Sequence, residues 1–201
     1  MHFDADSQQP WPWPLLGGDI ALDLVNTVSW RLNPARCQER LTSYERLLDW
    51  LGTTTGQDVE ALLPTISSSP VAEQVLSSVR TLRDALSRLL DSHLAGDPLP
   101  AEDRRRVEAA WRQGITAAAL RDRLPATWAV PLEEPSDIAD RLALEVGRFL
   151  QHQDLTRLRR CAGEGCGWLF LDGTRNRSRR WCDPNDCGNR TRVRNYARRH
   201  R

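Results

Sequence analysis

Two pairs of cysteines near the C-terminus constrain this chain more than any other feature. Cys161 and Cys166 have four residues between them, Cys182 and Cys187 have the same spacing, and fifteen residues separate the two pairs. The N-terminus lacks a basic region followed by an apolar stretch, so we expect no secretory signal, a cytoplasmic location and reduced thiols. In such a compartment, pairs with this spacing are typical of one structural zinc ion bound by four thiolates.

Paired cysteines can also form disulfides or serve as a redox switch. Disulfides require an oxidising environment, which leaves the redox switch as the main alternative to zinc. Four thiolates complete a tetrahedron and leave no position for water, so we expect the zinc to hold the fold without taking part in catalysis. The remaining thiol, Cys37, and the terminal His200 are expected to be ordinary side chains outside the site.

The residues around the cysteines suit a compact metal-binding fold. Two glycines lie between Cys161 and Cys166, and a proline with Asp and Asn neighbours lies between Cys182 and Cys187, so both stretches can turn sharply. We expect residues 168–171 and a later return through Trp181 to form a hairpin whose aromatic side chains cover the metal.

Charge is sorted along the chain and divides it into two parts. All 28 basic residues are arginines. Residues 1–156 hold 15 Arg and 23 acidic residues, a net charge of −8, whereas residues 157–201 hold 13 Arg and 4 acidic residues, a net charge of +9. We therefore predict an N-terminal domain over residues 1–156 and a zinc finger over residues 157–201, which stays positive after the −2 of a zinc tetrathiolate is counted.

Helical periodicity dominates the first of these parts. A capping box from Thr42 to Glu45 predicts a helix over residues 43–51 that ends at Gly52. A second helix is predicted from Pro70 to Gly96, with Val71 on its buried face. Further helices are expected from residue 102 to about 111 and from a cap at Ser136 through residue 150, with a hairpin formed by residues 115–120 and 127–132 between them.

The start of the chain is less regular. Residues 1–14, with alternating Pro and Trp, are expected to be an extended lead-in on the domain surface, and a helix opening at Asp19 is favoured over a buried strand. The predicted fold class is mainly α: a helical N-terminal domain with a small β-hairpin, followed by a small four-Cys zinc finger, treble-clef-like or ribbon-like, with a C-terminal helix. No apolar run approaches the length of a membrane span.

The finger concentrates arginines that we expect to contact nucleic acid, because so much guanidinium charge repels itself without an anionic partner. The predicted nucleic-acid-binding residues are Arg175, Arg177, Arg179, Arg180, Asn189, Arg190, Arg192, Arg194, Arg198 and Arg199. The last six lie on a helix expected from Gly188 to Arg201 that docks on the zinc core through Val193 and Ala197. Salt bridges with the acidic N-terminal domain are the alternative for some of these arginines, and bracing of the metal turn is the alternative for Asn189 and Arg190.

The residues around the four cysteines, and above all Cys-Gly-Asn-Arg at 187–190, resemble the CGNR zinc finger. Residues 18–27, Gly-Asp-Ile-Ala-Leu-Asp-Leu-Val-Asn-Thr, resemble the opening motif of the ABATE domain that normally precedes this finger. The two resemblances cover nearly the whole chain. They imply a bacterial, stress-linked transcription regulator in which Cys161, Cys166, Cys182 and Cys187 hold zinc and the finger meets DNA.

A polar patch near the N-terminus is the other candidate site. Asp23, Asn26 and Thr27 would share one helical face, and with Arg31 they could line a pocket for a small-molecule effector, although such side chains more often satisfy neighbouring backbone groups. No nucleophile–base pair, phosphate loop or metalloprotease spacing is present, so we do not expect an enzyme.

Three function hypotheses remain open at this stage. The favoured one is a DNA-binding transcription regulator. The alternatives are an RNA-binding protein, in which Trp168, Phe170 and Trp181 could stack on bases, and a small-molecule-binding or enzymatic N-terminal domain with the finger as an interaction module. A homodimer would suit palindromic DNA sites, but no heptad seam indicates one.

Overall fold

The computed structural model describes residues 11–57, 59, 70–122 and 127–200. Within them the protein is mainly α-helical, as predicted, with three two-stranded antiparallel sheets. The helices are α1 (Ile20–Val25), α2 (Tyr44–Thr55), α3 (Pro70–Ala95), α4 (Ala101–Ala117), α5 (Asp137–His152) and α6 (Asn189–Arg199). A short 3-10 turn, η3 (Leu155–Arg157), precedes the finger, and a π turn, η4 (Pro184–Gly188), lies within it.

Each of the small sheets joins neighbouring segments. The first pairs β1 (Val28–Ser29) with β2 (Gln38–Glu39), the second pairs β3 (Ala119–Leu120) with β4 (Trp128–Ala129), and the third pairs β5 (Leu158–Arg160) with β6 (Leu169–Leu171). In the finger sheet Leu158 lies opposite Leu171 and Arg160 lies opposite Leu169. No helix in the described part of the chain combines the length and apolar character that a lipid bilayer requires.

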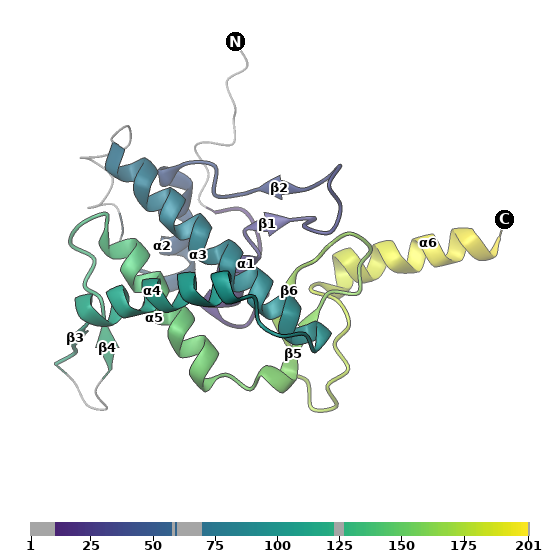
Figure 1. The fold of residues 1–201 in the computed structure, drawn as a ribbon. Coiled ribbons are helices and arrows are strands. Elements are labelled where there is room, and N and C mark those ends of the chain that lie inside the picture. Colours follow the sequence, from purple (N-terminus) through teal and green to yellow (C-terminus); the bar gives the residue numbers. More distant parts are fainter. Residues whose placement is uncertain (1–10, 58, 60–69, 123–126, 201) are drawn as a thin grey trace, which may run out of the picture.

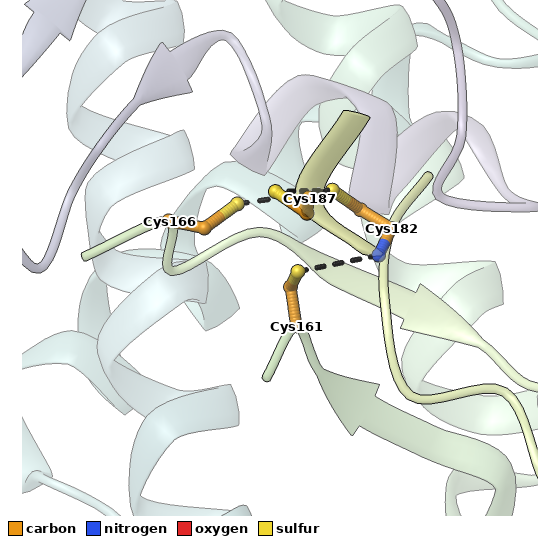
Figure 2. Close-up of side chains that lie close together, drawn as sticks. All are labelled: Cys161, Cys166, Cys182 and Cys187. Atoms are coloured by element: carbon orange, nitrogen blue, oxygen red, sulfur yellow. Dashed lines mark hydrogen bonds between the residues drawn. The ribbon is translucent and has the colours of Figure 1, made fainter. Parts of the chain in front are cut away.

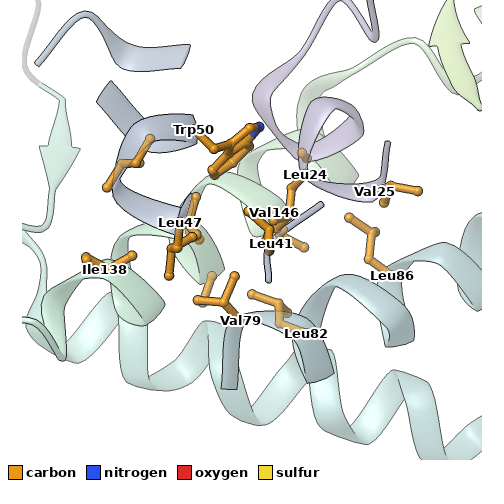
Figure 3. Close-up of a cluster of buried hydrophobic side chains, with 14 of the residues drawn as sticks. Leu24, Val25, Leu41, Leu47, Trp50, Val79, Leu82, Leu86, Ile138 and Val146 are labelled. Atoms are coloured by element: carbon orange, nitrogen blue, oxygen red, sulfur yellow. The ribbon is translucent and has the colours of Figure 1, made fainter. Parts of the chain in front are cut away.

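The main core lies where α1, α2, α3 and α5 meet (Figure 1). Leu24 of α1, Trp50 of α2, Leu86 of α3 and Val146 of α5 are among the buried side chains that converge there (Figure 3). Removing this much apolar surface from water is the main driving force for folding the helical layer. The strip of apolar residues on α3 therefore acts as predicted, except that Val71 in its first turn is exposed.

The ends of several elements differ from the sequence-based predictions. Ser43, not Thr42, caps α2 by accepting a hydrogen bond from the Arg46 amide, and the helix continues past Gly52 to a left-handed Gly56. Gly52 can remain helical because glycine costs a helix interior only about 1 kcal/mol, which the packing around it offsets. Ser136 makes no side-chain cap for α5.

Helix α4, the hairpin after it and the N-terminal lead-in also differ from the predictions. α4 runs to Ala117, so residues 115–117 are helical and the following hairpin is shorter than expected. The carboxylate of Asp137 accepts the amides of Glu133 and Glu134, so it organises the turn before α5. Trp11 is buried in the main core, which contradicts a purely superficial lead-in from that residue on; residues 1–10 lie outside the described part.

Candidate metal centre and nucleic-acid surface

The first cysteine pair sits in the turn that connects β5 to β6. The amide of Cys161 donates to the carbonyl of Trp168 over 2.8 Å and closes this turn as a continuation of the sheet. A Cβ on Gly163 would lie 2.9 Å from the sulfur of Cys187, so only glycine fits where the turn passes the metal ligands. The strand that pairs with residues 168–171 is thus the one before Cys161, and the predicted pairing with the return through Trp181 is wrong.

The second cysteine pair comes from the start of the C-terminal helix. Cys182 lies before η4, and Cys187 lies within it. The side chain of Asp183 accepts a hydrogen bond from the amide of Asn185, and its main-chain carbonyl accepts one from the amide of Gly188. Asp183 therefore stabilises the turn through both its side chain and its backbone. A turn between two strands that faces the first turn of a helix is typical of treble-clef fingers, one of the two predicted types.

The four sulfur atoms gather at one point. All of them lie within 4.8 Å of one another, and the four side chains point inward from both halves of the finger (Figure 2). The sulfur of Cys182 is 3.8 Å from that of Cys166 and 3.6 Å from that of Cys187. Zinc–sulfur bonds of about 2.3 Å place tetrahedral sulfurs about 3.8 Å apart, so the donor set fits one structural zinc ion.

The electrostatics of the cluster also call for a cation. Hydrogen bonds from the other three thiols lower the pKa of Cys161, whereas hydrogen bonding with Cys161 raises the pKa of Cys182. Four sulfurs this close together cannot all carry a negative charge without a cation, so all four can ionise together only around a metal. The amides of Gly163 and Cys182 donate to the sulfur of Cys161 over 3.4 and 3.3 Å, which is how protein groups orient zinc thiolates.

Aromatic side chains cover this centre as predicted. Phe170 is fully buried against the cysteines, with Trp168 and Trp181 half-buried beside it. The guanidinium of Arg179 lies 4.1 Å from the centre of the Phe170 ring and donates to the carbonyls of Cys182 and Leu16. Arg179 therefore fastens the finger together, and we did not expect this role from its place in the basic cluster.

The finger is joined to the N-terminal part by backbone-directed hydrogen bonds. The amide side chain of Asn26 donates to the carbonyl of Leu169 over 2.8 Å and accepts the Leu169 amide over 2.9 Å. The amide of Leu171 donates to the carbonyl of Gly17 over 2.9 Å, and the indole of Trp168 donates to the carbonyl of Val28 over 3.2 Å. The 18–27 motif and the residues on either side of it, Gly17 and Val28, thus bind the finger hairpin.

The side chains predicted to line an effector pocket lie together around α1, but each has partners inside the protein. Asp23 accepts the amide of Gly17 over 2.8 Å, and burial raises the pKa of its carboxyl. Thr27 donates to the carbonyl of Leu24 over 2.7 Å, and Arg31 donates to the carbonyl of Val25 over 3.1 Å. These contacts support a structural role for the motif, and the pocket itself remains a prediction.

The predicted nucleic-acid residues divide into anchored and exposed groups. Arg190 donates to the sulfur of Cys187 over 2.9 Å, pairs with Asp186 and lies 4.6 Å from the centre of the Trp30 ring, so it braces the metal turn. Arg194 pairs with Glu164. Five others have no carboxylate within ion-pair distance in the described part of the chain. These are Arg175, Arg180, Arg192, Arg198 and Arg199.

Helix α6 projects from the body instead of packing on it (Figure 1). None of its residues is buried, and Val193 and Tyr196 are 62% and 68% exposed. The predicted docking through Val193 and Ala197 is therefore wrong. Two small apolar side chains on an eleven-residue helix offer little area to bury, and the first turn is already fixed by Cys187 and Arg190.

Sequence reasoning missed two residues of this surface. Tyr196 is exposed beside Arg192 and Arg199, and its ring contacts that of His200 in a tilted arrangement with centroids 4.2 Å apart. The ring of Trp30 contacts the guanidinium groups of Arg36 and Arg190, which lie 3.6 and 4.6 Å from its centre. The signal for Tyr196 was available, because the residues around it on the helix are almost all polar and leave no apolar face to join.

Comparison with known families matches this architecture. The model of the CGNR zinc finger matches residues 157–200. The model of ABATE, described as "putative stress-induced transcription regulator", matches residues 18–164. The chain belongs to the ABATE family. Both resemblances seen in the sequence are thereby confirmed, and the ABATE protein carries a CGNR finger with one structural zinc site. A search of the curated proteins found no match.

Proposed function

We propose that this ABATE protein is a cytoplasmic bacterial transcription regulator whose finger binds DNA and whose N-terminal domain responds to a stress-related signal. The exposed basic helix carries the proposal. α6 has no buried residue, projects away from the body and has the width that the major groove of DNA admits. Neither family that matches the chain is described as an enzyme.

The contacts of α6 support one side of the helix as the side that would face a duplex. Arg190 and Arg194, four residues apart, turn toward Asp186 and Glu164 of the finger. On the other side of the helix, Arg192 and Arg199 are seven residues apart and have no carboxylate partner in the described residues; Arg192 donates only to the carbonyl of Pro184 over 3.3 Å. Asn195 lies beside them. Arginine recognises guanine edges and phosphates, and asparagine recognises adenine, so this side has the chemistry for DNA contact.

The salt dependence of binding to a DNA duplex tests this assignment. Arg192→Ala and Arg199→Ala should each reduce the slope of log K against log salt by about one unit, because each removes about one phosphate contact. Arg112→Ala is the matched control, since Arg112 is an exposed helical arginine paired with Glu108 in the N-terminal domain. Slopes that are unchanged in both finger variants would contradict the proposal.

RNA is the second candidate partner, and one observation favours it. The ring of Tyr196 is 68% exposed on the same side of α6 as Arg192 and Arg199, where it could stack on an unpaired base. Tyr196→Ala should weaken binding to single-stranded RNA about tenfold if this is the natural contact. The same variant should affect duplex DNA much less, so the pair of measurements separates the two partners.

A further inference from the structure

A cavity of about 410 Å³ lies between α3, α4 and α5, away from the metal centre and from the 18–27 motif. Leu89, Leu90 and Val107 are buried in its wall, while Trp111, Leu150 and Leu155 line it as half-buried side chains. Its size and its mostly apolar lining are those of small-molecule sites. Neither the predicted pocket residues nor the finger arginines contribute to it.

The wall of this cavity is shaped by a close approach of two helices. Trp111 of α4 lies so near α5 that a Cβ on Gly147 would fall 2.1 Å from its indole Cδ1 and Nε1 atoms. The absence of a side chain at Gly147 thus lets the indole lie against α5 beside the cavity. Leu99, which also lines the cavity, is 49% exposed.

The rim of the cavity carries cationic and hydrogen-bonding groups. The carboxylate of Glu108 is 2.6 Å from Arg112 and is thereby compensated. The side chains of Arg104 and His93, also on the rim, have no ion pair or hydrogen bond with any described residue. Gln151 adds a neutral amide. An apolar interior below an uncompensated guanidinium group is complementary to a molecule with an apolar body and an anionic head.

We propose that this cavity binds a small organic carboxylate, with its aromatic or aliphatic body between Trp111, Leu89 and Leu150 and its carboxylate at Arg104. Leu155 belongs to η3, which leads directly into β5 and then to Cys161. An occupant would therefore contact both the helical layer and the segment that enters the finger. This inference rests on the proposed function, because it gives the proposed signal response a binding site and a ligand class. Binding of the ligand can nevertheless be measured without nucleic acid.

Calorimetry on the zinc-loaded full chain tests the proposal with 2-naphthoate as the anionic probe and 2-naphthalenemethanol as its neutral counterpart. We expect 2-naphthoate to bind and Arg104→Gln to weaken it about threefold to tenfold, because a rim-exposed charge-assisted contact is lost. Arg105→Gln is the matched control, since Arg105 is an exposed neighbour on α4 that does not line the cavity. Binding of the neutral probe should be the same in both variants.

Amide and indole NMR shifts place the probe. The indole N–H of Trp111, identified with Trp111→Phe, and the amide of Gly147 should shift on addition of 2-naphthoate. Absence of binding at millimolar probe, shifts confined to other parts of the protein, or equal affinities in Arg104→Gln and Arg105→Gln would each overturn the proposal. If DNA binding failed while these results held, the carboxylate site would stand and only the proposed function of the finger would fall.

Discussion

The helical part and the finger of this protein are held together by different forces. In the helical part, a large cluster of apolar side chains from α1, α2, α3 and α5 excludes water. The second cluster contains the four cysteines and Phe170, with Leu16, Trp168 and Trp181 packed at its edge. So few apolar side chains cannot fold a segment of this length, and the metal must provide the rest. The comparison shows that one chain can combine a solvent-excluded core with a coordinated one.

Removal of the metal should produce the largest difference in stability between the finger and the helical part. Because structural zinc contributes about 10 kcal/mol or more to such modules, a chelator or Cys182→Ser should unfold the finger and leave α2, α3 and α5 ordered. Metal analysis should return about one zinc per chain, and hydrogen exchange should localise the loss. Cys37→Ser is the control, since Cys37 is exposed and outside the cluster. A finger that stays folded without metal would contradict this account.

Shortening a buried side chain of the main core should instead destabilise the helical part. Leu86 is fully buried in α3, so Leu86→Ala should lower the free energy of unfolding of the helical part by about 2–5 kcal/mol through lost burial and a residual cavity. Urea denaturation followed by the far-UV signal measures the loss. Ile115→Ala, at a position 47% exposed, should change stability by much less. Equal losses in the two variants would count against the core described here.

The junction between the two regions can be weakened at Asn26. Asn26→Ala leaves the amide and the carbonyl of Leu169 without their partners, so we expect a loss of about 1–3 kcal/mol. The amide of Leu169 should exchange faster and zinc should pass to a chelator sooner. Asn176→Ala, at an exposed position in the finger, serves as the control. Unchanged exchange at Leu169 would show that the finger is held by other contacts.

As the pH falls, the finger and the helical part should lose stability one after the other. The finger should lose its metal first, because thiolates bind zinc only when deprotonated. In the helical part, two hydrogen bonds of 2.8 and 2.7 Å from Arg88 hold the pKa of Asp103 below its ordinary value. The stability that Asp103 contributes is therefore complete above the ordinary carboxyl pKa, about 3.9, and is lost as the pH falls through the lowered value.

A comparison with Asp103→Asn measures the contribution of the Asp103 carboxylate to the stability of the helical part. The variant should be less stable at neutral pH by about 1 kcal/mol and should show a shallower decline in acid, since the carboxylate that links α4 to α3 is gone. Urea titrations of both proteins at a series of pH values give the two curves. Parallel acid declines would show that Asp103 does not titrate in the folded state as its contacts indicate.

Much of the helical layer was predictable because its signals are local. The apolar spacing along α3 and α5 predicted both helices, and the charge at residues 157–201 singled out the basic segment. Helix ends were less predictable: Ser43 caps α2 where Thr42 was expected, because adjacent residues both had the right chemistry. The division at residues 156 and 157 remains a prediction, and Leu158 and Leu169 of the finger hairpin join the main core.

The sequence by itself determined the four ligands of the zinc site, because thiol chemistry and spacing leave few alternatives. It also determined that the last segment is basic. Only the tertiary structure decided which arginines are paired: Arg179 and Arg190 are held by several groups of the finger, whereas Arg192 and Arg199 are exposed on α6 with no carboxylate partner among the described residues. Likewise, the 410 Å³ cavity exists only where α3, α4 and α5 cross. The reason is physical: bonding capacity belongs to a residue, but whether it is already satisfied depends on neighbours that folding brings from distant parts of the chain.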